Sequence, residues 1–227
     1  MAIEFQNYIQ IAGVIDQTEA QLLIDCGVTC LGFPLRLPVH KEDLSEESVA
    51  QIIQTFQPPV CGVLITYLDC AEEIHTLCQQ LGTPIVQLHG DISESELKHL
   101  KTLASGLQII KSLVVRQHNM AELEETARRL APYVDAFITD TFDPTTGATG
   151  ATGKTHDWSV TRRLIESTSR PVILAGGLTP ENVRTAILEV RPAGVDVHTG
   201  VEDATGRKTR DRVIPFLSET REGFARL

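Results

Sequence analysis

The stretch PVILAGGLTPEN, residues 171–182, contains a predicted strand, a glycine turn and the start of a helix. An apolar, β-branched run ends at Gly176 and Gly177. Thr179-Pro180 then predicts a helix start, with the threonine as cap and the proline at the first helical position. Glycines allow backbone N–H groups to approach an anion closely, and a helix N-terminus adds a favourable dipole. The unit therefore predicts an anion-binding turn, although an ordinary glycine-containing turn would have the same sequence.

The same order of strand and helix recurs along the whole chain. Short apolar runs predict eight strands, at residues 8–13, 28–33, 60–65, 84–89, 107–112, 134–140, 171–176 and 194–199. Between them, amphipathic stretches predict helices that include residues 18–26, 45–56 and 119–130 and a helix from residue 93 onward, with Ser45 and Ser93 as N-caps. This alternation predicts an α/β fold, a single (β/α)8 TIM barrel domain over residues 1–227.

Composition agrees with a barrel of this kind and excludes several classes of protein. The 227 residues include 42% hydrophobic and 5% aromatic side chains, so the core must be mainly aliphatic, as in parallel strands buried on both faces. The net charge of −10 argues against a nucleic-acid or anionic-membrane partner, but not against a local phosphate site. Five cysteines without C-x-x-C spacing predict reduced thiols in a cytoplasmic protein, and we expect neither a signal peptide nor a membrane span.

A second glycine-containing turn follows the last predicted strand. Thr199 and Gly200 lie in this turn, which would meet the turn at Gly176 and Gly177 in a closed barrel. The loops after strands 7 and 8 commonly form the phosphate site of such barrels. These residues therefore predict a site for a phosphorylated small molecule at the C-terminal ends of the strands.

Other polar residues lie where predicted strands end. Asp140 ends the sixth strand, a position typical of a catalytic carboxylate, whereas a solvated aspartate that caps the next loop is the alternative. Asp143 is the weaker candidate because it lies outside the strand. Gln87 and His89 end the fourth strand, where we expect His89 either to contact substrate or to have a structural role. The long polar stretch 141–158 is expected on the same face of the barrel.

The sequence lacks the usual signatures of metal and nucleotide sites. Its seven histidines are dispersed, without H-x-x-x-H or H-E-x-x-H spacing, so we expect no metal site. Neither a G-x-S-x-G elbow nor a P-loop is present, which argues against serine hydrolases of the α/β-hydrolase type and against NTPases.

Five stretches, taken in order, carry a resemblance to a known family. They are Gln-Leu-His-Gly (87–90), Ile-Thr-Asp-Thr (138–141), Gly-Ala-Thr-Gly (150–153) before Asp157-Trp158, Ile-Leu-Ala-Gly-Gly-Leu (173–178) with Pro-Glu-Asn-Val (180–183), and Val-Asp-Val with Gly-Val-Glu (195–202). They resemble the QLHG, LLDS/T, GGTG…FDW, ILAGGL.PENV and VDVSSGVE motifs of phosphoribosylanthranilate isomerases. The resemblance implies a TIM barrel of the ribulose-phosphate-binding type.

The resemblance also implies a reaction and a set of site residues. The family performs an Amadori rearrangement in tryptophan biosynthesis, in which a general acid protonates the ring oxygen and a general base removes a proton from C2 of the sugar. It implies that Asp140 is the acid and that no cofactor is needed. It places the remaining substrate and phosphate contacts at Gly176, Gly177, Thr199, Gly200, Gln87, His89, Asp196, Arg36 and Gly153.

This chain departs from the family where the base should be. The family begins with KICG, whose cysteine is the base, whereas this chain has Gln10 and Ala12 at the lysine and cysteine positions. The family's S-P-R motif is also changed, so that Arg36 is the candidate equivalent of its arginine. His198 replaces a small serine beside the phosphate loop.

Three residues are candidates for a replacement base. His198 ends the last predicted strand, next to the first in a closed barrel, and has a suitable intrinsic pKa. Asp16 follows the first strand, and Cys30 lies on the second, where a small buried apolar role is the simpler interpretation. We rank them in that order.

Three functions remain open at this point. The first is an isomerase acting on N-(5-phosphoribosyl)anthranilate. The second is a divergent enzyme on another phosphorylated sugar or amine, and the third is a non-catalytic barrel that binds a phosphorylated ligand. Either a monomer or a homodimer would suit an acidic barrel.

Overall fold

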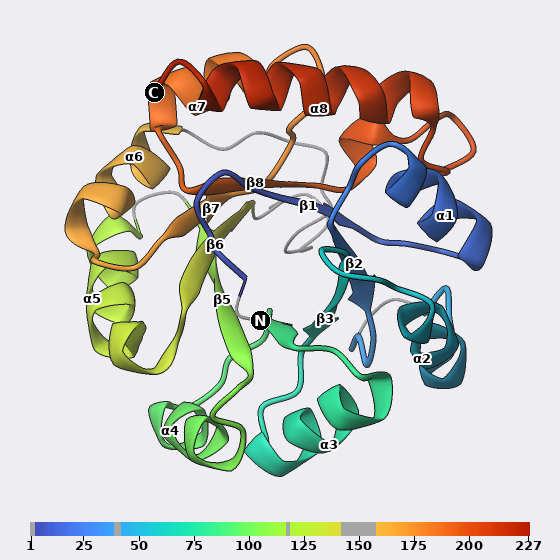
Figure 1. Ribbon diagram of the computed structural model, residues 1–227. Helices are drawn as coiled ribbons and strands as arrows, with labels where there is room; N and C mark the ends of the chain where they lie inside the picture. The colour runs from blue at the N-terminus through green and yellow to red at the C-terminus, as the bar shows by residue number, and fades with distance from the viewer. Residues whose placement is uncertain (1–2, 39–41, 117–118, 142–157) are drawn as a thin grey trace.

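The structure, a computed structural model, describes residues 3–38, 42–116, 119–141 and 158–227. It forms a closed barrel of parallel strands that follow one another in chain order, with helices around the outside (Figure 1). The strands are β1 (Tyr8–Ala12), β2 (Cys30–Pro34), β3 (Cys61–Thr66), β4 (Ile85–Leu88), β5 (Gln108–Val115), β6 (Ala136–Thr141), β7 (Val172–Leu174) and β8 (Gly194–Val197). Each predicted strand is confirmed in its place, and the expected TIM barrel is the fold.

The helices follow the strands in the expected alternation. They are α1 (Gln17–Asp25), α2 (Glu46–Gln54), α3 (Ala71–Leu81), α4 (Glu94–Leu103), α5 (Met120–Leu130), α6 (Trp158–Ser167), α7 (Val183–Val190) and α8 (Arg210–Phe224), with short 3-10 turns at η1 (Ala131–Tyr133) and η2 (Thr199–Val201). Among the described residues, no helix combines the length and the apolar character that a membrane crossing would require.

Two predicted helix caps are confirmed by their hydrogen bonds. Ser45 Oγ accepts from Ser48 N at 3.1 Å at the start of α2. Ser93 Oγ accepts from Glu96 N at 3.1 Å at the start of α4. Such contacts satisfy one of the N–H groups that a helix leaves unpaired at its first turn.

Helix α7 begins three residues later than the sequence predicted. Asn182 N and Val183 N both donate to Thr179 O, at 3.2 and 3.0 Å, so that residues 180–182 form a turn before the helix. The Asn182 side chain accepts from Thr179 N at 2.8 Å and donates to Gly177 O at 2.9 Å. The predicted start at Pro180 is therefore wrong, because Asn182 occupies the cap position and fixes the preceding glycine turn.

Alternate side chains of each strand point into the barrel, as the period of a strand requires. Toward the N-terminal ends of the strands this interior is apolar, with Tyr8, Cys30, Cys61, Val63, Ile85, Ile110, Ala136, Ile138 and Ile173 in one cluster. A larger apolar core fills the space between strands and helices. Toward the C-terminal ends the inward positions become polar: Gln10, Gln87, Ser112, Asp140 and Asp196 are all buried there.

A chain of hydrogen bonds runs from Tyr8 into this polar layer and across the barrel. Tyr8 Oη donates to Gln10 Oε1 at 2.7 Å, and Gln10 Nε2 donates to Gln87 Oε1 at 2.8 Å. Gln10 also pairs with Asp196 in the register of β1 and β8. Gln10 therefore fills the floor of the barrel mouth with a neutral amide.

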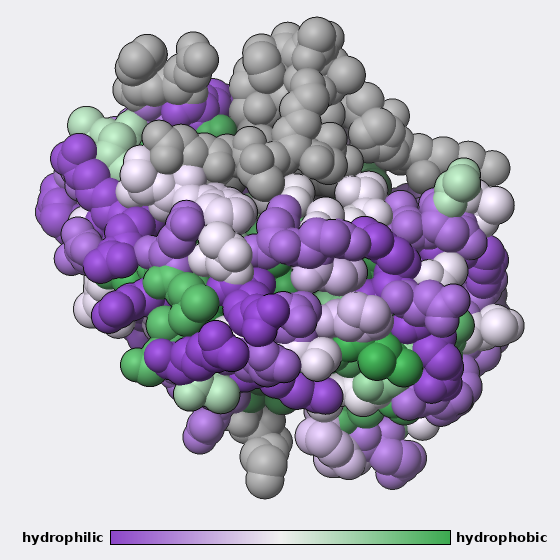
Figure 2. Space-filling view, turned by 90° about the horizontal axis from the view of Figure 1, so that it is seen from above, coloured by the Kyte–Doolittle hydropathy of each residue, from purple (hydrophilic) through white to green (hydrophobic). Residues whose placement is uncertain are grey.

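The outer surface over α7 and α8 is mainly hydrophilic. Figure 2 shows this side of the molecule, where apolar side chains occur in small separate groups among polar ones. Leu188 on α7 and Ile214 on α8 are partly exposed large apolar residues of this region. Isolated apolar residues of this kind are ordinary on a protein surface.

Candidate functional site

Asp140 lies at the mouth of the barrel and is held there by a histidine from another strand end. Its Oδ2 lies 3.1 Å from His89 Nε2, and His89 Nδ1 lies 3.1 Å from Ser112 Oγ. The edge of the His89 ring also packs against the ring of Tyr67, with ring centroids 4.8 Å apart. Both partners are nearly buried, with 10% of the Asp140 side chain and 7% of the His89 side chain exposed. The structure thus brings together the two residues that the sequence placed at the ends of β6 and β4.

A second carboxyl lies within electrostatic reach of Asp140. Burial, and then the charge of Asp140, raise the pKa of Asp196 to about 7, while Gln10 and Lys208 act in the opposite direction. Asp196 Oδ1 is buried without a hydrogen-bond partner. A carboxyl in this environment keeps its proton near neutral pH, because burial and a like charge both disfavour the ionised form. The mouth therefore holds a carboxyl pair with a retained proton, which suits acid catalysis.

The two predicted phosphate loops are in contact. Gly176 and Gly177 have φ values of 97° and 63°, in the left-handed region that favours glycine. Gly200, in the turn after β8, comes so close to this loop that an added Cβ would lie 1.8 Å from Leu178 O. The sequence therefore predicted the meeting of these loops correctly, and Thr199 lies beside Gly200 at the start of η2.

His198 lies at the junction of the first and last strands. The register of β1 and β8 pairs Ile11 with Val197, so Ala12 and His198 are the next residues along the two strands. The His198 ring lies against Gly13, where an added Cβ would fall 2.0 Å from its Nε2. About a third of this side chain is exposed, namely 31%, and its Nε2 lies 3.3 Å from Glu202 Oε1.

A buried lysine ties this junction together. Lys208 Nζ donates to Gly13 O at 2.6 Å and to Glu202 Oε1 at 3.0 Å. It also lies 3.7 Å from Glu19 Oε2, and neither the Lys208 nor the Glu19 side chain has more than 1% of its surface exposed. A buried ammonium group needs such partners, because an unpaired charge there would be strongly unfavourable. Sequence inspection missed this network, since Lys208 follows no pattern that predicts burial.

Other predicted residues are placed away from the carboxyl pair. Asp16 caps α1, where it accepts from Glu19 N at 2.8 Å, and its Oδ2 lies 2.6 Å from Arg207 Nη2. The Arg36 side chain turns to Glu46 at the start of α2, with Nε and Oε1 2.7 Å apart. Their assignment to the site stays a prediction, as does that of Gly153, which lies outside the described residues.

Cys30 lies deeper in the barrel than the mouth. Its neighbour in the register of β1 and β2 is Gln10, one inward position below Ala12. Its Sγ lies 3.8 Å from Cys61 Sγ within the apolar cluster. This placement agrees with the simpler interpretation of Cys30 as a small buried side chain.

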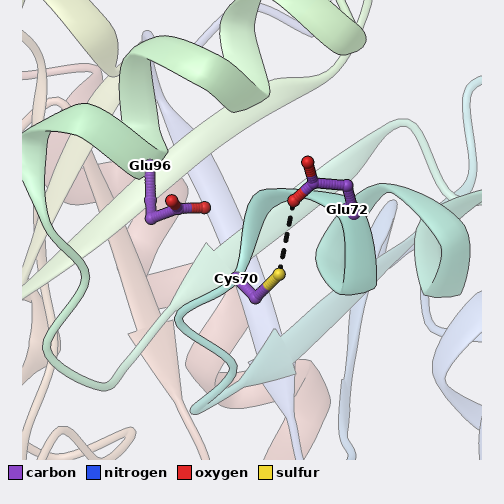
Figure 3. Close-up of side chains that lie close together, drawn as sticks. All are labelled: Cys70, Glu72 and Glu96. Atoms are coloured by element: carbon purple, nitrogen blue, oxygen red, sulfur yellow. Dashed lines mark hydrogen bonds between the residues drawn. The ribbon is translucent and has the colours of Figure 1, made fainter.

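A group of potential metal ligands lies at the rim, between α3 and α4 (Figure 3). Cys70 Sγ lies 3.3 Å from Glu72 Oε2. The other carboxylate oxygen of Glu72, Oε1, lies 2.7 Å from His99 Nε2. Glu96 Oε2 accepts from Ala71 N at 2.8 Å. These atoms already have protein partners that join the two helices, so we assign the group to the packing of α3 against α4.

Comparison with known proteins gives a consistent result along the chain. The model of the family described as N-(5′-phosphoribosyl)anthranilate (PRA) isomerase matches residues 9–219. The N-(5′-phosphoribosyl)anthranilate isomerase 2 of Methanosarcina mazei is 37% identical over 221 residues, which cover 95% of both chains.

Solved structures agree with this match. Phosphoribosyl anthranilate isomerase from Thermotoga maritima is 28% identical, with a TM-score of 0.79 and coverage of 96% of this chain and 100% of its own; that enzyme is also described as dimeric. A PRA isomerase in complex with reduced 1-(o-carboxyphenylamino)-1-deoxyribulose 5-phosphate is 26% identical, with a TM-score of 0.77 and coverage of 96% and 100%.

Proposed function

The chain belongs to the N-(5′-phosphoribosyl)anthranilate isomerase family, and from this membership we propose that it converts N-(5′-phosphoribosyl)anthranilate to 1-(o-carboxyphenylamino)-1-deoxyribulose 5-phosphate in tryptophan biosynthesis. The reaction is an intramolecular aldose–ketose isomerisation, so no external oxidant is required. The observation that carries the proposal is the family match over residues 9–219, combined with Asp140 at the barrel mouth.

Asp140 is the general acid in this proposal. Its proton passes to the ring oxygen of the sugar, the C1′–O4′ bond breaks, and the nitrogen lone pair forms a C1′=N iminium group. The contact with His89 orients the Asp140 carboxyl, and the neighbouring Asp196, whose pKa is raised to about 7 by burial and by the charge of Asp140, holds a proton beside it near neutral pH. The partially buried site strengthens these interactions, because little water competes for them.

The glycine loops after β7 and β8 hold the phosphate in this proposal. Gly177 and Gly200 allow the main chain to approach an anion without a side chain in between. A main-chain site of this kind explains how a chain with a net charge of −10 binds an anionic substrate.

Turnover by purified protein tests the proposal directly. The substrate is generated in place from anthranilate and phosphoribosyl pyrophosphate with an added transferase, and its loss is followed by fluorescence. We expect saturable turnover, together with growth of a tryptophan auxotroph that lacks this isomerase. No turnover and no growth would contradict the proposal and would favour a different phosphorylated substrate or a purely ligand-binding barrel.

We also propose a cytoplasmic homodimer. The five cysteines are free thiols, as expected in a reducing compartment, and the Thermotoga maritima relative is dimeric. Light scattering coupled to gel filtration is expected to give twice the chain mass of 24.9 kDa. The mass of a single chain at every concentration would contradict the dimer and leave the isomerase proposal untouched.

A further inference from the structure

The end of β1 offers no proton acceptor to a substrate in the barrel mouth. Ala12 has a methyl side chain, and Gln10 below it is an amide that is already bonded to Tyr8 and Gln87. An Amadori rearrangement nevertheless needs a base for the proton at C2′. That base must come from another residue that faces the mouth.

His198 directly follows the neighbouring strand β8, next to the end of β1. The register of β1 and β8 ends with Ile11 opposite Val197, so Ala12 and His198 are the next residues, and each lies two positions after a residue of the pair Gln10 and Asp196. Ala12 and His198 therefore lie side by side at the ends of two neighbouring strands. Gly13 makes this arrangement feasible, since any side chain at that position would overlap the imidazole ring.

The surroundings of His198 fix the direction of its two ring nitrogens. The Nε2 edge lies against Gly13 and 3.3 Å from Glu202 Oε1. Glu202 is itself held by Lys208 Nζ at 3.0 Å, and the same ammonium group binds Gly13 O. With Nε2 directed at the carboxylate, Nδ1 lies on the other side of the ring, as in pairs where a carboxylate orients a catalytic imidazole.

The charges around His198 keep its imidazole neutral. Burial and the positive charge of Lys208 lower the pKa of His198 to about 4, while Asp43 acts in the opposite direction. Glu202 faces Nε2, and Glu19 faces Lys208 from α1. A neutral imidazole can accept a proton throughout the neutral pH range.

We propose that His198 is the general base of this enzyme and that Glu202 is the residue that positions it. The inference rests on the proposed isomerase function and adds the location of the base to it. Among the residues that the structure describes, the other candidates have different roles: His89 bridges Asp140 and Ser112, Asp16 caps α1 and pairs with Arg207, and Cys30 lies below the mouth.

The step that follows ring opening is balanced among the substrate, His198 and the Asp140 carboxylate. Nδ1 of His198 takes the proton from C2′, and the C–H electron pair forms the C1′=C2′ bond. The π electrons of the C1′=N iminium group return to nitrogen and give an enolamine. The imidazolium then returns its proton to C1′ while the C2′ hydroxyl becomes a carbonyl. The hydroxyl proton passes through solvent to the Asp140 carboxylate left by ring opening, so both side chains are restored and the overall change is an isomerisation.

His198→Ala is the direct test. We expect kcat to fall by about 100- to 10,000-fold, the usual contribution of a general base, with KM changed by less than about threefold. The kinetic isotope effect for substrate deuterated at C2′ should increase, because proton removal becomes fully rate-limiting. His75→Ala on the outer helix α3 is the matched control and should retain wild-type turnover.

Recovery of activity by a second substitution distinguishes the loss of a base from damage to the fold. In the His198→Ala background, the second substitution Ala12→Cys places a thiol at the end of β1, beside the lost imidazole. We expect this double variant to regain kcat by at least about tenfold over His198→Ala. Wild-type turnover that survives His198→Ala within about threefold would overturn the inference while leaving the isomerase function in place. A failure of rescue by the thiol, with the single variant folded, would equally overturn it.

The pH profile of kcat in Glu202 variants tests the positioning role of this residue. Glu202→Gln removes the negative charge at Nε2, so the pKa of His198 should fall further and the acidic limb of the kcat profile should move to lower pH. We expect a loss of roughly tenfold in kcat, while Glu202→Asp should recover most of it. An unchanged profile in Glu202→Gln would contradict the positioning role.

No turnover by the wild-type protein would instead contradict the proposed function itself. The two failures are therefore distinguishable, since the base can be tested only against a measurable wild-type rate.

Discussion

The imidazole of His198 and the α-carbon of Gly13 are in such close contact that an added Cβ at Gly13 would fall 2.0 Å from Nε2. Gly13 also has a φ of 74°, a conformation that disfavours a side chain on its own account. Both the contact with His198 and the positive φ therefore require a glycine at position 13. This residue directly follows Ala12, where the resemblance to the family places a cysteine. The absence of a side chain at Gly13 is thus part of how the histidine is seated.

Gly13→Ala is expected to displace the His198 ring and to lower kcat by at least about tenfold, because a general base must be placed within hydrogen-bonding reach of its proton. The matched control is Gly82→Ala at the end of α3, where φ is 72° but nothing lies within 4 Å of an added Cβ. Both variants bear a similar backbone strain of about 1 kcal/mol. Equal kinetic effects in the two would show that the ring contact is irrelevant to turnover.

Asp140→Asn should abolish the acid step without disturbing the fold. The amide keeps the shape of the side chain next to His89 but cannot supply the proton for ring opening. We expect kcat to fall by about 100- to 10,000-fold, with KM and the thermal midpoint little changed. A variant that is folded and retains turnover near the wild-type rate would remove Asp140 from the mechanism.

Gly200→Ala tests the contact between the phosphate loops. A methyl group there would meet Leu178 O at 1.8 Å, so the loops must separate, and we expect KM to rise by about tenfold or more. Gly106→Ala is the control, because an added Cβ there has nothing within 4 Å. Inorganic phosphate as a competitive inhibitor provides a second measurement, and its inhibition constant should rise in Gly200→Ala alone.

Asp196 makes the stability of the fold depend on pH in the direction opposite to most aspartates. The folded state retains its proton up to about pH 7, whereas the unfolded chain loses it near pH 4. The folded state binds more protons in this window, so the free energy of unfolding falls as pH rises through it. The difference between the two pKa values corresponds to at most about 4 kcal/mol.

Urea unfolding of the wild type and Asp196→Asn at several pH values measures this dependence. We expect the variant to gain stability relative to the wild type as pH rises from about 4 to about 7, because its amide does not ionise. His198, with its pKa lowered to about 4, contributes the opposite slope over much of the same range, so the difference between the two proteins is the informative quantity. Parallel curves would contradict the raised pKa of Asp196.

Asp16 should matter for stability rather than for turnover. Its side chain accepts from Glu19 N at the start of α1. Asp16→Ala is expected to lower the free energy of unfolding by about 1 kcal/mol, and Asp16→Asn, which keeps the cap, by less. A large loss of kcat in the folded Asp16→Asn variant would instead favour Asp16 as the base.

The strands and the anion-binding turns could be predicted from the sequence because their signals are local. The β-branched run 172–174 and the two glycines after it determine their own conformation, and Asp140 was marked by its place at a strand end. The start of α7 could not be found in this way. A Thr-Pro pair favours a helix start, but the hydrogen bonds of Asn182 to both sides of the turn prevail over it.

The neighbours of His198 could not be predicted from sequence patterns, for a different reason. The sequence ranked His198 first among the bases, but Glu202 and Lys208 become its neighbours only through the turn after β8 and the closure of that strand on β1. Burial of Lys208 is likewise a tertiary property, since nothing in the residues around it distinguishes it from a surface lysine. The pairing of Arg36 with Glu46 at the rim is also a tertiary contact that the sequence did not indicate, and its predicted substrate contact stays a prediction.

The pairing of β8 with β1 joins the two ends of the chain, and the bond from Lys208 to Gly13 spans 195 positions of sequence. The barrel is therefore not closed until the last strand has been synthesised and has paired with β1. A nascent chain with seven strands contains Asp140 and His89 but lacks His198 and the turn at Gly200, the second half of the proposed phosphate site. If His198 is the base, turnover requires the closed barrel, and its recovery during refolding would report the docking of β8 on β1 rather than the formation of the separate strands.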